Sequence, residues 1–160
     1  MTRLFRWCLC CVALLLGAAG AVCAATVVAD GTAVRLTDEM SRVSVQGGVR
    51  FLIEDAGQPL TLGQVLAPET DPRWQFYPGR HINLVIQRRP VWFRFEVHNE
   101  SQRDDWLLNL NAPLLEKVAV QLVDPASGDA TPVQHGGIKV PASQKLMKYP
   151  EPVFLLLVPP

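Results

Sequence analysis

The fold is decided by the stretch PVWFRFEVHN, residues 90–99, and by the alternating segment that follows it, WLLNLNAPLLEKVAVQLV, residues 106–123. In the first stretch, one set of alternate positions holds Val91, Phe93, Phe95 and Val97, and the other holds Trp92, Arg94, Glu96 and His98. A period of two places successive side chains on opposite faces of a β-strand. We therefore expect Phe93 and Phe95 in a core, with Trp92 on the opposite face of the sheet.

Residues 106–123 continue this period in two further runs. The apolar positions on one face are Trp106, Leu108 and Leu110 in the first run and Val118, Val120 and Leu122 in the second. Pro113 separates the two runs, because proline has no N–H to give to a sheet ladder. The three runs predict strands of an antiparallel β-sandwich.

Strands are also predicted on either side of this unit. Residues 43–54 favour a strand with Val49, Phe51 and Ile53 facing inward. Residues 82–86 alternate in the same way.

Local signals predict a turn, a helix and a terminal strand. Asp30-Gly31 favours a hairpin turn, and Thr61 favours the N-terminal cap of a short helix over residues 61–66. The apolar run of residues 152–160 is bounded by prolines. A continuous run of this kind is typical of a fully buried strand with neighbours on both sides.

The strand pattern resembles the second extracellular domain of the seven-transmembrane receptors with diverse intracellular signalling modules. That family has a V-W-x-R-F strand ending in Asn, then a W-x-L-x-L strand, and then a P-L-hydrophobic-x-x-V strand. The matching residues here are Val91, Trp92, Arg94, Phe95, Asn99, Trp106, Leu108, Leu110, Pro113, Leu114 and Val118. The chain departs from the family before the tryptophan strand, where Gln87-Arg88-Arg89 replaces a Gly-x-x-x-Ser-like approach.

The resemblance implies an all-β, jelly-roll-like sandwich with one short helix, similar to carbohydrate-binding modules. In the family, one or two more strands follow the equivalent of residues 152–160 and complete the sandwich. We therefore expect the C-terminal strands of the domain to be missing from these 160 residues. The resemblance also implies membrane helices and a cytoplasmic output module, such as a diguanylate cyclase or a histidine kinase, in a longer parent protein.

The N-terminal residues have the three parts of a secretory signal peptide. Two arginines precede the apolar run of residues 7–22, and Ala24 and Ala25 offer a cleavage site. The run has about 16 residues, fewer than the roughly 20 that a membrane-spanning helix needs, which favours cleavage over an uncleaved anchor. We predict a signal peptide over residues 1–25 and a periplasmic sensory domain over residues 26–160.

All cysteines of the chain lie inside this leader: Cys8, Cys10, Cys11 and Cys23. After cleavage the domain has no thiol, which excludes a disulfide, a thiolate metal site and a cysteine nucleophile. A lipoprotein is disfavoured because Val22, rather than a small residue, precedes Cys23.

Size and charge indicate a single, nearly neutral domain. Without Arg3 and Arg6, 13 of the 15 basic residues remain against 15 acidic ones, a net charge of −2. The sequence shows no basic patch, and nucleic acid is not an expected partner. About 135 residues after cleavage suit one domain with one core.

The sequence offers no catalytic constellation. The histidines, His81, His98 and His135, lack a metal-ligand spacing. The acid pairs Glu54-Asp55 and Asp104-Asp105 lie at strand ends, where solvated turn residues are commoner than catalytic carboxylates. There is no G-x-S-x-G elbow and no phosphate-binding glycine loop. We therefore expect no enzyme activity, no metal and no cofactor.

Binding is the better hypothesis. Trp92 and Arg94 offer a flat ring and a hydrogen-bonding group, which is the equipment that sugar-binding sandwiches use. Trp74 and Tyr77, in a proline-rich loop, form a competing pair of ligand-binding candidates. The alternative is a purely structural role, in which Trp92 packs under the Trp74 loop and Arg94 forms an ion pair with a nearby acid on the face of the sheet.

The expected function is extracytoplasmic ligand sensing, as the input domain of a bacterial membrane-bound signalling protein. The expected partners are a small-molecule ligand, with a carbohydrate as one candidate, and a membrane-embedded signalling module in the full-length context. Two alternatives stay open. One is a free-standing periplasmic carbohydrate-binding or adhesion module, and the other is an uncharacterised periplasmic hydrolase.

The leader gives the first testable prediction. The exported protein should begin at Ala25 or Thr26, because the small residues of the cleavage zone end there. Mass spectrometry of the periplasmic fraction measures this directly. Recovery of the soluble periplasmic chain with Met1 intact would contradict the prediction.

Overall fold

The computed structural model describes residues 7–11, 33–45, 48–77, 84 and 87–160; of residues 7–11 it describes the backbone alone. Strands dominate this part of the chain, together with one α-helix and two short 3-10 helices. The elements are β1 (Trp7–Cys11), β2 (Val34–Leu36), β3 (Arg50–Ile53), α1 (Leu62–Leu66), η1 (Pro68–Arg73), β4 (Gln75–Phe76), β5 (Val91–Asn99), β6 (Asp105–Asn109), β7 (Val118–Val123), β8 (Gln134–Gly136), η2 (Ala142–Gln144) and β9 (Val153–Leu157).

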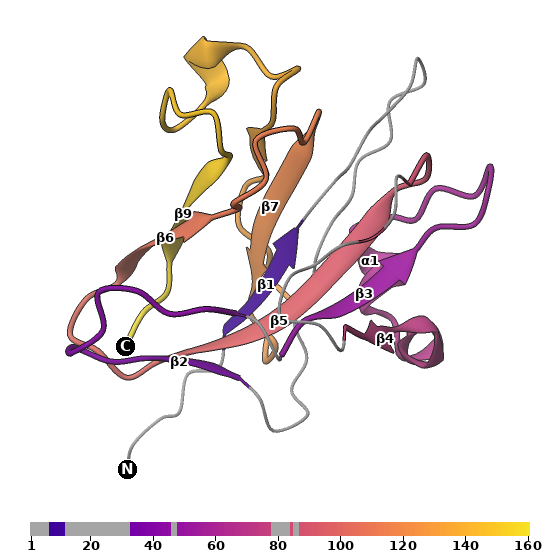
Figure 1. Ribbon diagram of the computed structural model, residues 1–160. Helices are drawn as coiled ribbons and strands as arrows, with labels where there is room; N and C mark the ends of the chain where they lie inside the picture. Colours follow the sequence, from indigo (N-terminus) through magenta and orange to yellow (C-terminus); the bar gives the residue numbers. More distant parts are fainter. Residues whose placement is uncertain (1–6, 12–32, 46–47, 78–83, 85–86) are drawn as a thin grey trace.

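The strands form two sheets (Figure 1). The larger sheet has the order β4-β3-β5-β1-β7-β8, with β2 paired to the C-terminal part of β5, and the smaller sheet consists of β6 and β9. The prediction of an all-β fold is therefore confirmed. The prediction of purely antiparallel pairing is wrong at β2, which runs parallel to β5 from Val34 beside Val97 to Leu36 beside Asn99.

The long strand β5 is buried along almost its whole length, on both faces. Phe93 and Phe95 belong to the main core, whereas Trp92 belongs to a second cluster. The predicted division of the two faces is confirmed. It follows from the pleat of the strand, because adjacent side chains point to opposite sides.

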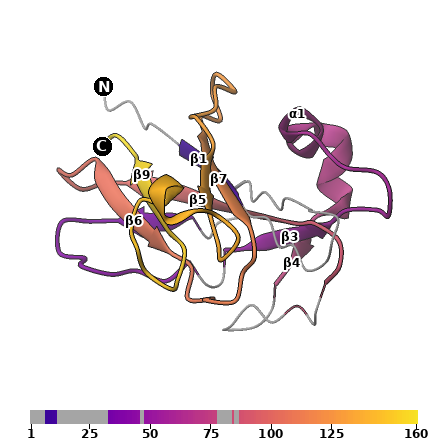
Figure 2. The same cartoon turned by 90° about the horizontal axis from the view of Figure 1, so that it is seen from above.

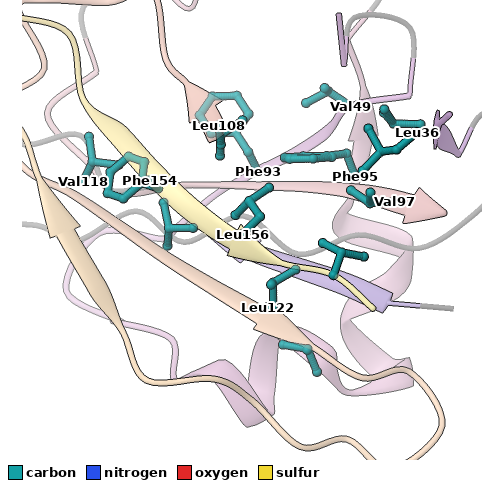
Figure 3. Close-up of a cluster of buried hydrophobic side chains, with 14 of the residues drawn as sticks. Leu36, Val49, Phe93, Phe95, Val97, Leu108, Val118, Leu122, Phe154 and Leu156 are labelled. Carbon is teal, nitrogen blue, oxygen red and sulfur yellow. The ribbon is translucent and has the colours of Figure 1, made fainter. Parts of the chain in front are cut away.

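The main core lies between the larger sheet and β6–β9. Figure 3 shows Phe93 and Phe95 of β5 in one cluster with Leu108 of β6 and with Phe154 and Leu156 of β9. Its buried members are Val34, Leu36, Val49, Val91, Phe93, Phe95, Val97, Leu108, Val118, Val120, Leu122, Val123, Phe154, Leu156 and Val158. The inward positions predicted by alternation for β6 and β7 are thus confirmed.

The second core lies under α1, on the opposite face of β3 and β5, and consists of Leu52, Val65, Trp74 and Trp92. In the view from above, α1 lies at one end of the molecule and β6–β9 at the other (Figure 2). The predicted N-terminal cap of the helix is confirmed. Thr61 accepts a hydrogen bond from the Gln64 N–H, and the Gln64 side chain accepts one from the Thr61 N–H, which is a capping box.

The terminal strand β9 differs from the sequence prediction. In the described part of the chain it pairs only with β6, and Leu157 is 54% exposed while Phe154 and Leu156 are buried. The other edge of β9 meets a side chain instead of a strand. The Gln134 amide donates to the Leu155 carbonyl (2.5 Å) and accepts from the Leu155 N–H (3.1 Å). The Gln134 side chain thus satisfies both backbone groups of Leu155. The prediction of a neighbouring strand on this side of β9 is wrong for the described part of the chain.

Several predicted features fall on residues that are not described. The hairpin turn at Asp30-Gly31 lies outside the described residues, as does most of the predicted strand over residues 82–86. Leu84 is described, and it packs against the main core outside any strand. Residues 7–11, inside the predicted signal peptide, form β1 between β5 and β7.

Truncation of the central phenylalanine tests the core. Phe95→Ala should lower the free energy of unfolding by about 3–5 kcal/mol, because it removes a buried ring and leaves a cavity. Leu114→Ala is the matched control: Leu114 is 81% exposed, and the expected change is within about 0.5 kcal/mol. Denaturant titration measures both. A loss below about 1 kcal/mol for Phe95→Ala would show that the assigned face of β5 is wrong.

Candidate functional site

The face of β5 that holds the candidate binding residues is covered rather than open. Trp92 is 5% exposed and Arg94 is 3% exposed. Trp74, which follows η1, is 7% exposed and packs in the same cluster as Trp92. The structure therefore brings Trp92, Arg94 and Trp74 together, but beneath α1 and η1 and not at the surface.

Trp92 is fixed by a buried carboxylate. Its Nε1 donates to Glu54 Oε1 at 2.7 Å, and the Leu60 N–H donates to the same oxygen at 3.0 Å. Glu54 follows β3 directly and is 3% exposed. A buried carboxylate is costly unless hydrogen bonds satisfy it. The contact ties the loop before α1 to the start of β5.

Arg94 joins η1 to the sheet. Its Nη1 donates to Asp71 Oδ1 at 2.6 Å, and its guanidinium lies 5.2 Å from the centre of the Trp74 ring. The Asp71 side chain is 52% exposed, so that one partner of the ion pair reaches solvent and the other is buried. Charge and ring contact together hold η1 against β5.

Two further polar contacts stabilise this cover. The Thr70 hydroxyl donates to the Gln64 carbonyl at 2.5 Å, which joins η1 to α1. Arg73 and Asp55 form an exposed ion pair at 2.8 Å. We call residues 62–73 the α1–η1 cover. Asp71 and Arg73 attach its C-terminal end through their ion pairs with Arg94 and Asp55, and Val65 packs in the second core.

Two buried donors in this cluster have no hydrogen-bond partner among the described residues: Trp74 Nε1 and Arg94 Nε. Farther along the same face, His98 Nε2 lies 2.9 Å from Glu96 Oε1, and Glu96 is 5% exposed. The face therefore presents a basic group, acidic groups and aromatic rings within one interior layer. Such a layer suits the recognition of a polar ligand only when the α1–η1 cover moves.

Tyr77 is not part of this cluster. It is half-buried, and its ring meets Phe51 edge-on at 6.1 Å between centroids. Phe51 packs against the main core, on the other face of β3. The candidate pair of Trp74 and Tyr77 is thus split between opposite faces of the sheet.

Asn99 is a structural residue that sequence reasoning noticed only as part of a family pattern. Its Oδ1 accepts from the Ser101 N–H (3.1 Å) and hydroxyl (2.6 Å), and its Nδ2 donates to the carbonyls of Arg103 (2.5 Å) and Val158 (2.6 Å). It closes the turn after β5 and fastens that turn to the residue that follows β9. No local signal identifies the Val158 contact, because the two residues are 59 positions apart.

A small hollow lies between β8 and the segment before β9, lined by His135, Lys145, Tyr149 and Glu151 among others. It has a volume of about 10 Å³, which is room for about one water molecule. Within the described residues, no three metal-ligating side chains gather, and no helix has both the length and the apolar character to cross a membrane.

These features define a β-sheet domain with a closed, partly polar second core. Comparison with protein families then shows that residues 46–160 match the family described as 7TMR-DISM extracellular 2. The match covers more than half of the chain, and the chain therefore belongs to this family of extracytoplasmic domains of membrane receptors. No curated protein and no solved structure matches the chain.

The Trp92 contact can be tested without removing a ring. Trp92→Phe should lower the free energy of unfolding by about 1–3 kcal/mol beyond its packing loss, because Glu54 loses a buried donor. Trp106→Phe is the matched control, since Trp106 Nε1 has no hydrogen-bond partner in the described part of the chain. Chemical denaturation compares the two. Equal losses of unfolding free energy in the two variants would show that the Trp92–Glu54 hydrogen bond does not stabilise the fold.

Proposed function

We propose that this chain is the ligand-sensing input domain of a bacterial membrane-bound signalling protein, with a diguanylate cyclase or a histidine kinase as its output. Membership of the receptor family supports the receptor context. The observation that carries the sensing role is the α1–η1 cover. It rests on β5 through the Arg94–Asp71 ion pair, with Trp74 beside the buried guanidinium.

The proposed mechanism is a shift between two arrangements of this cover. In the closed arrangement Asp71 pairs with Arg94, and Trp92 pairs with Glu54. A small polar ligand, with a carbohydrate as one candidate, would compete for Arg94 and stack on Trp74 in an open arrangement. A ligand that binds one arrangement better shifts the population toward it by that difference in affinity. The moved cover then offers the membrane-proximal part of the receptor a changed surface.

We propose binding rather than catalysis at this face. The cluster contains acids at Glu54, Asp71 and Glu96, but Glu54 and Asp71 each hold a donor from the protein itself. A general base must lie within hydrogen-bond reach of a substrate proton, and the carboxyls of Glu54 and Glu96 are buried. The free-standing carbohydrate-binding module is the second candidate. The same layer of aromatic and charged groups favours it, but in such a module the cover would not be coupled to an output.

A thermal-shift screen tests the sensing role. The exported domain is heated with and without sugars, amino acids and carboxylates, and we expect at least one class to raise Tm. A ligand at 100 times its Kd adds about 2.7 kcal/mol of stability, which the method resolves easily. A panel without any shift would contradict the proposal, and turnover of a panel member would favour the hydrolase.

A pair of charge variants locates the ligand. Asp71→Asn weakens the closed arrangement, and the shift caused by the ligand from the screen should therefore grow. Glu100→Gln is the matched control, since Glu100 forms an ion pair with Arg35 at 2.7 Å outside the cluster. Equal ligand shifts in both variants would exclude the face under the α1–η1 cover as the site.

A further inference from the structure

The centre of the larger sheet is filled by a strand from the predicted leader. β1 pairs antiparallel with β5, from Trp7 beside Val97 to Cys11 beside Phe93. On its other side β1 pairs antiparallel with β7, from Cys8 beside Val123 to Cys11 beside Val120. In the described part of the chain β5 and β7 do not pair with each other. We call the space between them the β5–β7 slot (Figure 1).

Cleavage of the leader would take β1 away. The facing edges of β5 and β7 would then carry unpaired N–H and C=O groups at the centre of the sheet, directly over the main core. Buried backbone groups without partners are costly, and an open edge is a site of self-association. The exported domain therefore needs another strand in this place.

The walls of the slot specify the chemistry of that strand. On the side of the main core, Phe93, Phe95 and Leu122 flank the slot, and they require apolar side chains from the occupant. On the other side, Arg94 and Gln121 flank it and accept polar side chains. The slot thus fits a strand of about five residues with alternating apolar and polar positions.

The entrance of the slot indicates where such a strand comes from. β1 begins opposite Val97, two residues before Asn99. The Asn99 side chain holds the Val158 carbonyl at 2.6 Å, and the Val158 N–H donates to the Asp104 carbonyl at 2.8 Å. The segment after β9 is therefore delivered to the end of the sheet at which a strand antiparallel to β5 must start.

We propose that in the exported protein the β5–β7 slot holds a strand joined to Pro160 in the same polypeptide, and that residues 7–11 occupy this place only before cleavage. The inference rests on the predicted signal peptide and not on the ligand. It makes the slot the junction between this domain and the next part of a longer protein.

A fused strand tests the proposal on the exported chain. The precursor is extended after Pro160 by a Gly-Ser linker of about six residues, which spans roughly the 10 Å between packed sheets, and by Val-Thr-Val-Thr-Val. The exported fusion should be monomeric and should melt at least about 5 °C above the exported chain without the extension. The matched control is Val-Thr-Pro-Thr-Val, in which proline cannot give its N–H to the ladder.

A disulfide then locates the strand. The domain without its leader has no cysteine, so two introduced thiols form an unambiguous pair. β1 places Cys10 opposite Gln121, and the fourth residue of the fused strand takes the same register. Cysteine at that fourth residue should cross-link to Gln121→Cys and not to Ser143→Cys, which lies at an exposed position of η2.

Each outcome decides the proposal. A higher Tm with the Gln121→Cys cross-link supports it. An equal shift with the proline control, a cross-link to Ser143→Cys, or a fused strand that leaves Tm unchanged would overturn it. An exported chain that keeps residues 7–11 would also overturn it, because the leader would then be the permanent occupant of the slot.

Discussion

The structure depends on the burial of β5 on both of its faces. On one face Phe93 and Phe95 meet the small sheet of β6 and β9 across the main core. On the other face Trp92 and Arg94 carry the α1–η1 cover. A single strand therefore supports two layers, and each layer uses a different kind of contact. Apolar packing is continuous in the first layer, whereas the second layer relies on a few hydrogen bonds and on the Arg94–Asp71 and Arg73–Asp55 ion pairs to complete a small core.

This division bears on how the domain can respond to a ligand. The main core includes members from β2, β5, β6, β7 and β9, and rearranging it would disturb most of the fold. Among the described residues the second core has four buried members, and Asp71 at its rim is half exposed. Regions with few buried apolar contacts open at lower free energy than the rest of a protein. The α1–η1 cover is thus the part of the domain best suited to move.

Alternation predicted β3, β5, β6 and β7, and it predicted the division of the two faces of β5. The two-residue period of the sequence places Phe93 and Phe95 in one layer and Trp92 in another. The side chain of Thr61 correctly predicts the N-terminal cap of α1. The prediction for β9 was wrong because continuous apolar sequence does not distinguish a strand neighbour from a side chain such as Gln134, which binds both backbone groups of Leu155.

The candidate site was harder to predict than the fold. Sequence identified Trp92, Arg94 and Trp74, and it left open whether they bind a ligand or pack against each other. Their burial depends on partners that are distant in the chain: Glu54 lies 38 positions from Trp92, and Asp71 lies 23 from Arg94. No local pattern encodes such pairs.

Native-state hydrogen exchange of the exported domain tests the central claim, that β5 supports a rigid layer on one face and a movable cover on the other. The account predicts that the amides on the β3 side of β5 exchange only through global unfolding, while amides of residues 62–73 exchange through a local opening of lower free energy. It also predicts that Asp71→Asn lowers the free energy of that local opening alone. Equal protection of the cover and β5, unchanged by Asp71→Asn, would contradict the account.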